Sequence, residues 1–191
     1  TSGWAASLDL SALDGTTGFR LDGVDMDDYA GFSVSGAGDM NGDGYDDLVI
    51  GAYGADPGGD AKAGETYVIF GKASGWAVSL DLATLNGSTG FRLDGIDADD
   101  FSGFTVAGAG DLNGDGFDDI IIGAGTADGG GNSDAGESYV IFGGDFSKSV
   151  THLGTSPADT INGTSGANIM VGGLGNDTLD GQGGADVLRG G

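Results

Sequence analysis

Short apolar runs, separated by turns rich in glycine and aspartate, make up most of this chain. Asp47–Ala52 and Thr66–Phe70 are nearly continuous apolar runs, which is typical of strands that are covered on both faces. Phe32–Ala37 and Phe91–Asp94 alternate apolar with polar residues, which is typical of strands with one polar face. In Phe91–Asp94 the alternation places the two apolar side chains inward and the two charged ones outward. The pattern predicts an all-β fold.

The strand pattern is repeated along the chain. Residues 4–71 align with residues 76–143 at a constant offset of 72 and without a gap. About two-thirds of the aligned positions are identical, and an internal repeat of this length indicates a modular fold. Four short antiparallel strands in each repeat make one blade of a β-propeller. We therefore expect two four-stranded propeller-type blades.

An acidic loop lies between the first and second predicted strands of each repeat. The loops are Asp39–Asp47 and Asp111–Asp119, with oxygen side chains at positions 1, 3, 5 and 9 and glycines at positions 4 and 6. This spacing resembles the first nine positions of an EF-hand calcium loop, in which glycine permits the tight turn. Position 12 is Ile50 or Ile122 in place of glutamate, so we expect each loop to join two strands. A hairpin turn that binds no metal is the alternative, but crowded carboxylates repel one another unless a cation neutralises them.

The repeat resembles the FG-GAP repeat, the blade of the integrin α-subunit propeller. Gly31-Phe32 precedes the first strand, the acidic loop follows, and Gly51-Ala52-Tyr53 stands where the family usually reads Gly-Ala-Pro. The second copy has Gly103-Phe104 and Gly123-Ala124-Gly125 at these places. Neither copy has the proline of the family, so the conformation of the local turn is not predicted. Every metal ligand of the family is nevertheless present. The resemblance implies these calcium ligands, with residues at position 7 acting through their carbonyls: Asp39, Asn41, Asp43, Tyr45, Asp47, Asp111, Asn113, Asp115, Phe117 and Asp119.

From Gly154 onward the repeat period drops to nine residues. Position 6 of the four copies is occupied by Asp159, Asn168, Asp177 and Asp186, and position 8 is always apolar. This pattern resembles the RTX nonapeptide, which binds calcium in a parallel β-roll. In such a roll the position-8 side chain points inward and turns 18 residues apart share an ion, which pairs Asp159 with Asp177 and Asn168 with Asp186. The resemblance implies these ligands: Asp159, Asn168, Gly172, Gly173, Gly175, Asp177, Gly181, Gly183 and Asp186.

The first two nonapeptides depart from the double glycine of the repeat, so we expect their sites to be weaker or empty. An unstructured glycine-rich tail is the alternative for this part of the chain. We expect residues 1–24 to form a linker and an outer strand that completes a preceding blade. The first blade is expected at residues 25–95, and a second blade without its own fourth strand at residues 96–146. A linker is expected at residues 147–153, followed by the β-roll at residues 154–191.

The unmatched strands at the two ends of the repeat region allow two interpretations. Phe19–Asp22 has the pattern of a fourth strand with no first three strands before it, and the second blade has no fourth strand after Phe142. The chain is either a segment of a longer propeller or a subunit that associates head to tail by strand addition. Depending on the rotation per subunit, such association gives a ring or an open filament.

Charge and composition limit the classes of function that this chain can have. The 191 residues include 30 acidic and six basic side chains, with a net charge of −24 and no cysteine. This balance excludes a basic nucleic-acid surface, and no apolar run is long enough to insert into a membrane. Without disulfides, an extracellular protein of this kind would be stabilised by Ca2+. No catalytic constellation is visible, so we expect no catalytic residues and no cofactor besides Ca2+.

The leading hypothesis is a calcium-dependent extracellular structural or adhesive module of a bacterial secreted or surface protein. The combined resemblance to FG-GAP and RTX repeats implies type I secretion. The expected partner is a second copy of this chain or the rest of a longer propeller. A protein or a glycan is a further candidate ligand. The alternative is a calcium-stabilised accessory or binding segment of a larger secreted hydrolase or adhesin. We interpret Trp4 and Trp76 as packing residues between blades, Tyr67 and Tyr139 as core residues, and His152 as part of a linker.

Overall fold

The computed structural model of the chain describes residues 6–191, and the fold is all-β, as the sequence predicts. The first sheet contains β2 (Ser33–Gly38), β3 (Asp47–Ala52), β4 (Glu65–Ile69) and β6 (Gly90–Asp94), antiparallel and in that order. Both middle strands are largely buried, because β3 and β4 are covered on both faces. In β6, Phe91 and Leu93 pack against the core and the charged residues between and after them are exposed, in agreement with the alternation.

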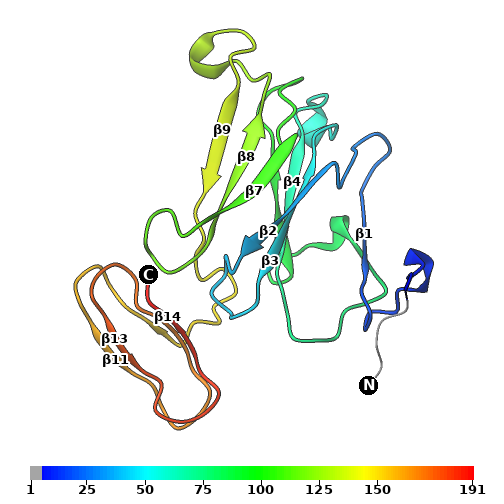
Figure 1. Cartoon of the computed structure of the whole chain (residues 1–191). Helices are drawn as coiled ribbons and strands as arrows, with labels where there is room; N and C mark the ends of the chain where they lie inside the picture. The colour runs from blue at the N-terminus through cyan, green and yellow to red at the C-terminus, as the bar shows by residue number, and fades with distance from the viewer. Residues whose placement is uncertain (1–5) are drawn as a thin grey trace.

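The second sheet repeats the first but has three strands. It contains β7 (Thr105–Gly110), β8 (Asp119–Ala124) and β9 (Glu137–Ile141), and the pairing of β8 with β9 copies that of β3 with β4. β2 lies beside β7 where the two sheets meet (Figure 1). Both sheets are consistent with propeller blades of the FG-GAP type.

The polar face of β2 is the face that meets the second sheet. The backbone N–H of Val106 donates to Ser33 Oγ at 3.0 Å, and that of Gly108 donates to Ser35 Oγ at 3.4 Å. Phe32 and Val34, the apolar side of the alternation, are exposed. The serine hydroxyls take this position because they accept hydrogen bonds from β7, whose glycine and alanine residues allow a close approach.

Two apolar clusters form the core. One lies between the sheets and includes Met40, Val49, Val68, Phe70 and Ile120. The other lies on the outer side of the first sheet, where Ile50, Tyr67, Ile69 and Leu82 are buried against the connection between β4 and β6. Tyr67 is thus a core residue, as the sequence predicts, and its hydroxyl donates to the Glu65 carboxylate.

The N-terminal segment pairs with the connection between β4 and β6. β1 (Arg20–Asp22) forms a parallel ladder with β5 (Ser79–Asp81), and η1 (Leu10–Ala12) and η3 (Leu82–Thr84) are single 3-10 turns beside them. The Trp76 ring stacks on Phe19 with centroids 4.1 Å apart, which agrees with a packing role. Trp4 lies outside the described residues. Whether β1 completes a preceding blade stays a prediction, since its visible partner is β5.

The C-terminal repeats form a parallel β-roll. One face contains β10 (His152–Leu153), β12 (Ile169–Val171) and β14 (Val187–Arg189), and the other contains β11 (Thr160–Asn162) and β13 (Thr178–Asp180). The assignment of His152 to a linker is therefore wrong, because β10 pairs with β12 as the first strand of the roll. Paired residues are 18 apart, so successive nonapeptides alternate between the faces, as the repeat predicts. Met170 is fully buried, whereas Leu188, at the same repeat position, is exposed on the outermost strand of its sheet.

The remaining connections are short. η2 (Pro57–Gly59) and η4 (Gly129–Gly131) are 3-10 turns in the corresponding hairpin loops of the two sheets. Within residues 6–191, no helix has the length and apolar character needed to cross a membrane.

Close packing between the sheets predicts the effect of adding a methyl group at Gly51. A Cβ at this position would overlap the carbonyl oxygen of Gly103, a backbone atom that cannot move alone. We expect Gly51→Ala to lower the free energy of unfolding by about 1–3 kcal/mol. Gly36→Ala is the control, because a Cβ there meets nothing within 4 Å. Urea unfolding in calcium buffer measures both, and equal effects of the two substitutions would refute this packing argument.

Candidate metal centres

Each acidic loop forms the hairpin between the first two strands of its sheet. The loop at Asp39–Asp47 joins β2 to β3, and the one at Asp111–Asp119 joins β7 to β8, as predicted. Gly42 and Gly44 have φ values of +73° and +91°, and the matching glycines of the second loop have +76° and +90°. The expected use of glycine at positions 4 and 6 is therefore confirmed, since a side chain would be strained in this backbone conformation.

Side-chain oxygens in the first half of each loop are turned toward the loop backbone. Asp39 accepts hydrogen bonds from the N–H groups of Asp43 at 3.0 Å and Gly44 at 2.8 Å. Asn41 Oδ1 accepts from the Asp43 N–H at 2.9 Å, and Asp43 Oδ1 accepts from the Tyr45 N–H at 3.0 Å. The second loop has the same bonds at Asp111, Asn113 and Asp115. The side chains at positions 1, 3 and 5 thus all point toward the inside of one turn.

The aspartate at position 9 fastens the loop to the end of the third strand. The Asp47 carboxylate accepts from the Met40 N–H at 2.9 Å and the Gly71 N–H at 2.8 Å. Asp119 accepts from the Leu112 and Gly143 N–H groups in the same way. This aspartate therefore has a structural role that the sequence alone does not reveal.

Burial places these carboxylates where a cation would be favourable. Removal from water raises the pKa of Asp47 to about 7, and the charges of Asp39 and Asp43 contribute in the same direction. The pKa of Asp39 is also raised, again chiefly by burial. A bound divalent ion offsets both effects, because it replaces lost hydration and neutralises like charges. The donors are all oxygen, which is the ligand type that Ca2+ prefers.

The β-roll brings together the residues that the nonapeptide register pairs. Asp177 Oδ1 accepts from the Asp159 N–H at 2.8 Å, and Asp186 Oδ1 accepts from the Asn168 N–H at 2.9 Å. In the described part of the chain, Asp177 Oδ2 is buried without a hydrogen-bond partner. An unsatisfied buried carboxylate oxygen fits the requirements of a cation site. The proposed carbonyl ligands at Gly172, Gly173, Gly175, Gly181 and Gly183 stay predictions.

The side chains are not arranged as a complete coordination shell. Within residues 6–191, no three acidic, histidine or cysteine side chains converge on one point in the way a metal ion requires. The carboxylates instead satisfy loop N–H groups, so calcium binding would require them to turn by small rotations toward the ion. The ligand assignments in both loops and in the roll therefore stay predictions.

An arginine of the roll connects the two acidic loops. Arg189 Nη1 donates to the Asp39 carbonyl oxygen at 2.9 Å and lies 3.2 Å from Asp39 Oδ2. Arg189 Nη2 lies 3.0 Å from Asp118 Oδ2, which also accepts from the Asp39 N–H. Val187 packs on Gly44 and Val171 on Gly116, so the roll rests on both loops. The only sequence signal is a basic residue at position 9 of the last nonapeptide, in a chain with six basic residues.

Comparison with known proteins assigns both kinds of repeat. The FG-GAP repeat family model matches residues 30–69 and 102–141, and each match contains one acidic loop. The model of the RTX calcium-binding nonapeptide repeat, with four copies, matches residues 154–191. This chain carries two FG-GAP repeats and an RTX repeat array. Both families are structural or binding modules found in extracellular or surface proteins.

The FG-GAP repeats are similar in sequence to integrin α subunits. Integrin alpha pat-2 of Caenorhabditis briggsae is 33% identical over 121 residues, which is 60% of this chain and 9% of that protein. Integrin alpha-5 of Xenopus laevis is 34% identical over 116 residues, which is 60% of this chain and 10% of that protein. The chain thus spans about a tenth of the length of these relatives.

Substitution within the first FG-GAP loop tests its assignment as a calcium site. We expect Asp39→Asn to weaken calcium binding at one site by at least about tenfold, since the loop loses a charged ligand. Asp60→Asn is a matched control, because it makes the same charge change at an exposed position where the second repeat already has Asn132. Isothermal titration calorimetry measures both variants. Equal calcium titrations of the parent and Asp39→Asn would refute the assignment.

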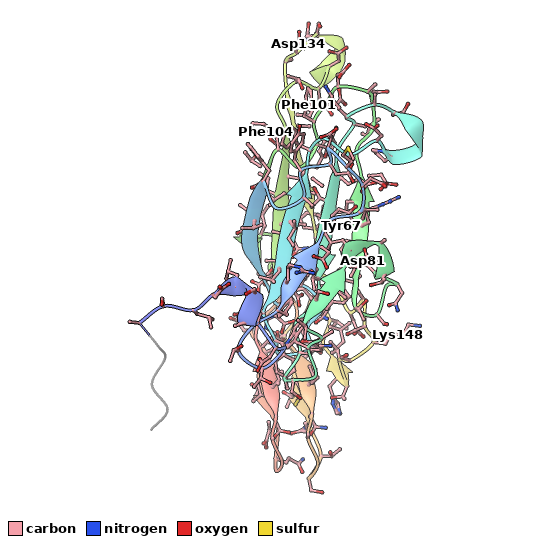
Figure 2. The ribbon with its side chains drawn as sticks, turned by 90° about the vertical axis from the view of Figure 1, so that its right-hand side faces the viewer. Tyr67, Asp81, Phe101, Phe104, Asp134 and Lys148 are labelled. Atoms are coloured by element: carbon pink, nitrogen blue, oxygen red, sulfur yellow. The ribbon has the colours of Figure 1, made fainter. Side chains whose placement is uncertain are left out.

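Removal of the Arg189 guanidinium tests the connection between roll and blades. Arg189→Met should lower the free energy of unfolding by about 1–3 kcal/mol, since two hydrogen-bond acceptors in a partly buried contact lose a charged donor. Thermal unfolding should also separate the roll from the blades into two transitions. Lys148→Met makes the same charge change at an exposed residue (Figure 2) and should have little effect. A single unshifted transition in Arg189→Met would contradict the proposed connection.

Proposed function

We propose that this chain is a calcium-dependent structural or adhesive module of a bacterial secreted or surface protein and has no catalytic activity of its own. The observation that carries the proposal is the joining of two calcium-repeat systems by Arg189, which reaches both the Asp39 loop and Asp118. Calcium bound in the FG-GAP loops and in the roll would then stabilise one connected unit.

Calcium acts in this proposal by selective binding to the folded chain. An ion that binds only the native state stabilises it by RT ln(1 + [Ca2+]/Kd) at each site. At tenfold saturation, four sites contribute about 6 kcal/mol, which is comparable with the whole stability of a domain. The chain would stay unfolded in a calcium-poor cytosol, pass through a type I secretion channel and fold outside the cell. Extracellular calcium modules bind at about 10⁻⁴–10⁻³ M, which suits such a change of compartment.

Self-association is part of the proposed structural role. Strand addition at the edges of the sheets would join copies head to tail, and the product would be a ring or a filament. The edge of β9, which is unpaired within residues 6–191, supports this, because exposed sheet edges readily accept a further strand.

A second candidate function is ligand binding as an accessory segment of a larger secreted hydrolase or adhesin. Tyr29, Phe32 and Phe104 are exposed and contact Tyr53, which also lies near Phe101. Figure 2 shows Phe101 and Phe104 in the upper half of the blades, away from the β-roll. Exposed aromatic groups of this kind favour a glycan or protein ligand.

Chelation tests the calcium dependence directly. In excess EDTA we expect the thermal midpoint to fall by at least about 10 °C, because the loop and roll carboxylates lose their counter-ions. Added Ca2+ should restore it, whereas an equal concentration of Na+ should not. Circular dichroism against temperature provides the measurement. An unchanged midpoint in EDTA would refute the proposed function.

A further inference from the structure

The second sheet has an open edge where the first has a fourth strand. β6 pairs with β4, but within residues 6–191 no strand pairs with the corresponding edge of β9. After β9 the chain continues into the β-roll, so residues 142–191 do not supply this strand. The outer face of the second sheet exposes apolar surface beside this edge: Val140 is 39% and Phe142 52% exposed, whereas their counterparts Val68 and Phe70, which lie between the two sheets, are 0% and 4% exposed.

The missing strand would also supply a charge. In the first sheet, Arg92 Nη1 of β6 lies 3.0 Å from the carboxylate of Glu65 in β4, and Arg92 stands opposite Tyr67. β9 has the same acceptor pair, since the Tyr139 hydroxyl donates to Glu137. Within residues 6–191, however, no basic side chain forms an ion pair with Glu137. The edge of β9 therefore lacks both a fourth strand and the arginine that such a strand would bring.

β1 carries the side chains that the edge lacks. Gly18–Gly23 is identical in sequence to Gly90–Gly95, the segment that contains β6. One edge of β1 pairs with β5, and its other edge is unpaired in the described structure. The Arg20 side chain is 68% exposed and forms its ion pair with Asp22 of the same strand. β1 thus has a free edge and an arginine in the register that β6 uses.

We propose that β9 of one copy accepts β1 of a second copy as its fourth antiparallel strand, with Arg20 of the second copy paired to Glu137. This inference rests on the proposed self-association and specifies its contact. The pairing of β4 with β6 predicts the register Tyr139 opposite Arg20, Ser138 opposite Leu21 and Val140 opposite Phe19. Phe19 would then lie beside Val140, as Phe91 lies beside Val68.

The contact must join different copies. β1 and β9 lie on opposite sides of the molecule, with the first sheet between them (Figure 1). Two different surfaces meet in each contact, so a pair of copies still has one donor strand and one acceptor edge free for further copies. Such a heterologous contact produces a closed ring or an open filament. Because each copy has a net charge of −24, the assembly should require calcium to reduce repulsion.

Charge exchange at the two positions tests the pairing in the full chain. Sedimentation velocity at millimolar Ca2+ should show association of the parent, weakened by about tenfold to a hundredfold in Arg20→Glu and in Glu137→Arg. The double variant Arg20→Glu/Glu137→Arg should regain association, because its ion pair is restored with the two charges exchanged. Lys148→Glu is the charge-matched control and should associate like the parent. Circular dichroism checks that every variant is folded.

A cross-link tests the register independently, because the chain has no cysteine. Leu21→Cys/Ser138→Cys should form covalent oligomers with a short bismaleimide, whereas Leu10→Cys/Ser138→Cys, with an exposed residue outside β1, should not. Association of the parent without charge rescue and without the in-register cross-link would overturn this inference and leave the proposed self-association standing. A parent that stays monomeric in millimolar calcium would overturn both.

Discussion

Concentrated carboxylate charge in two tight hairpins is the constraint on which the rest of the structure depends. Asp39, Asp43 and Asp47 lie within nine residues, and burial raises the pKa of Asp47 to about 7. Loop N–H groups hold these carboxylates in place but do not neutralise them. A bound cation would supply the missing charge, and the ion and the fold would then stabilise each other. The same relation holds in the β-roll, where Asp177 Oδ2 is buried without a partner.

The hairpins also determine how the parts of the chain are joined. Because both loops lie at the same end of the blades, the roll can rest on both at once, with Arg189 between Asp39 and Asp118. Calcium at the loops would therefore order the surface that receives the roll. An ordered roll, in turn, places the positive charge of Arg189 beside the two loops. This mutual stabilisation would explain why two unrelated repeat types occur in one chain.

Much of the fold can be predicted from the sequence, because the strands carry strong local patterns. β3 has the predicted bounds, since Asp47–Ala52 is a continuous apolar run that begins at the end of the loop. The 18-residue register of the roll follows from the nine-residue period. The parallel pairing of β1 with β5 could not be predicted, because the alternation in Phe19–Asp22 indicates a strand but not its partner, and β5 is only three residues long. The role of Arg189 depends on how the roll docks, which is a tertiary property, and the ligand geometry depends on an ion.

The most direct test of the calcium account is anomalous diffraction from crystals grown in millimolar Ca2+. We expect an ion in each hairpin, about 2.3–2.6 Å from the oxygens of its ligands, with Asp39 and Asp111 rotated away from the loop N–H groups. If both hairpins lacked an ion at this concentration while the two sheets and the roll kept their present arrangement, the account would be wrong.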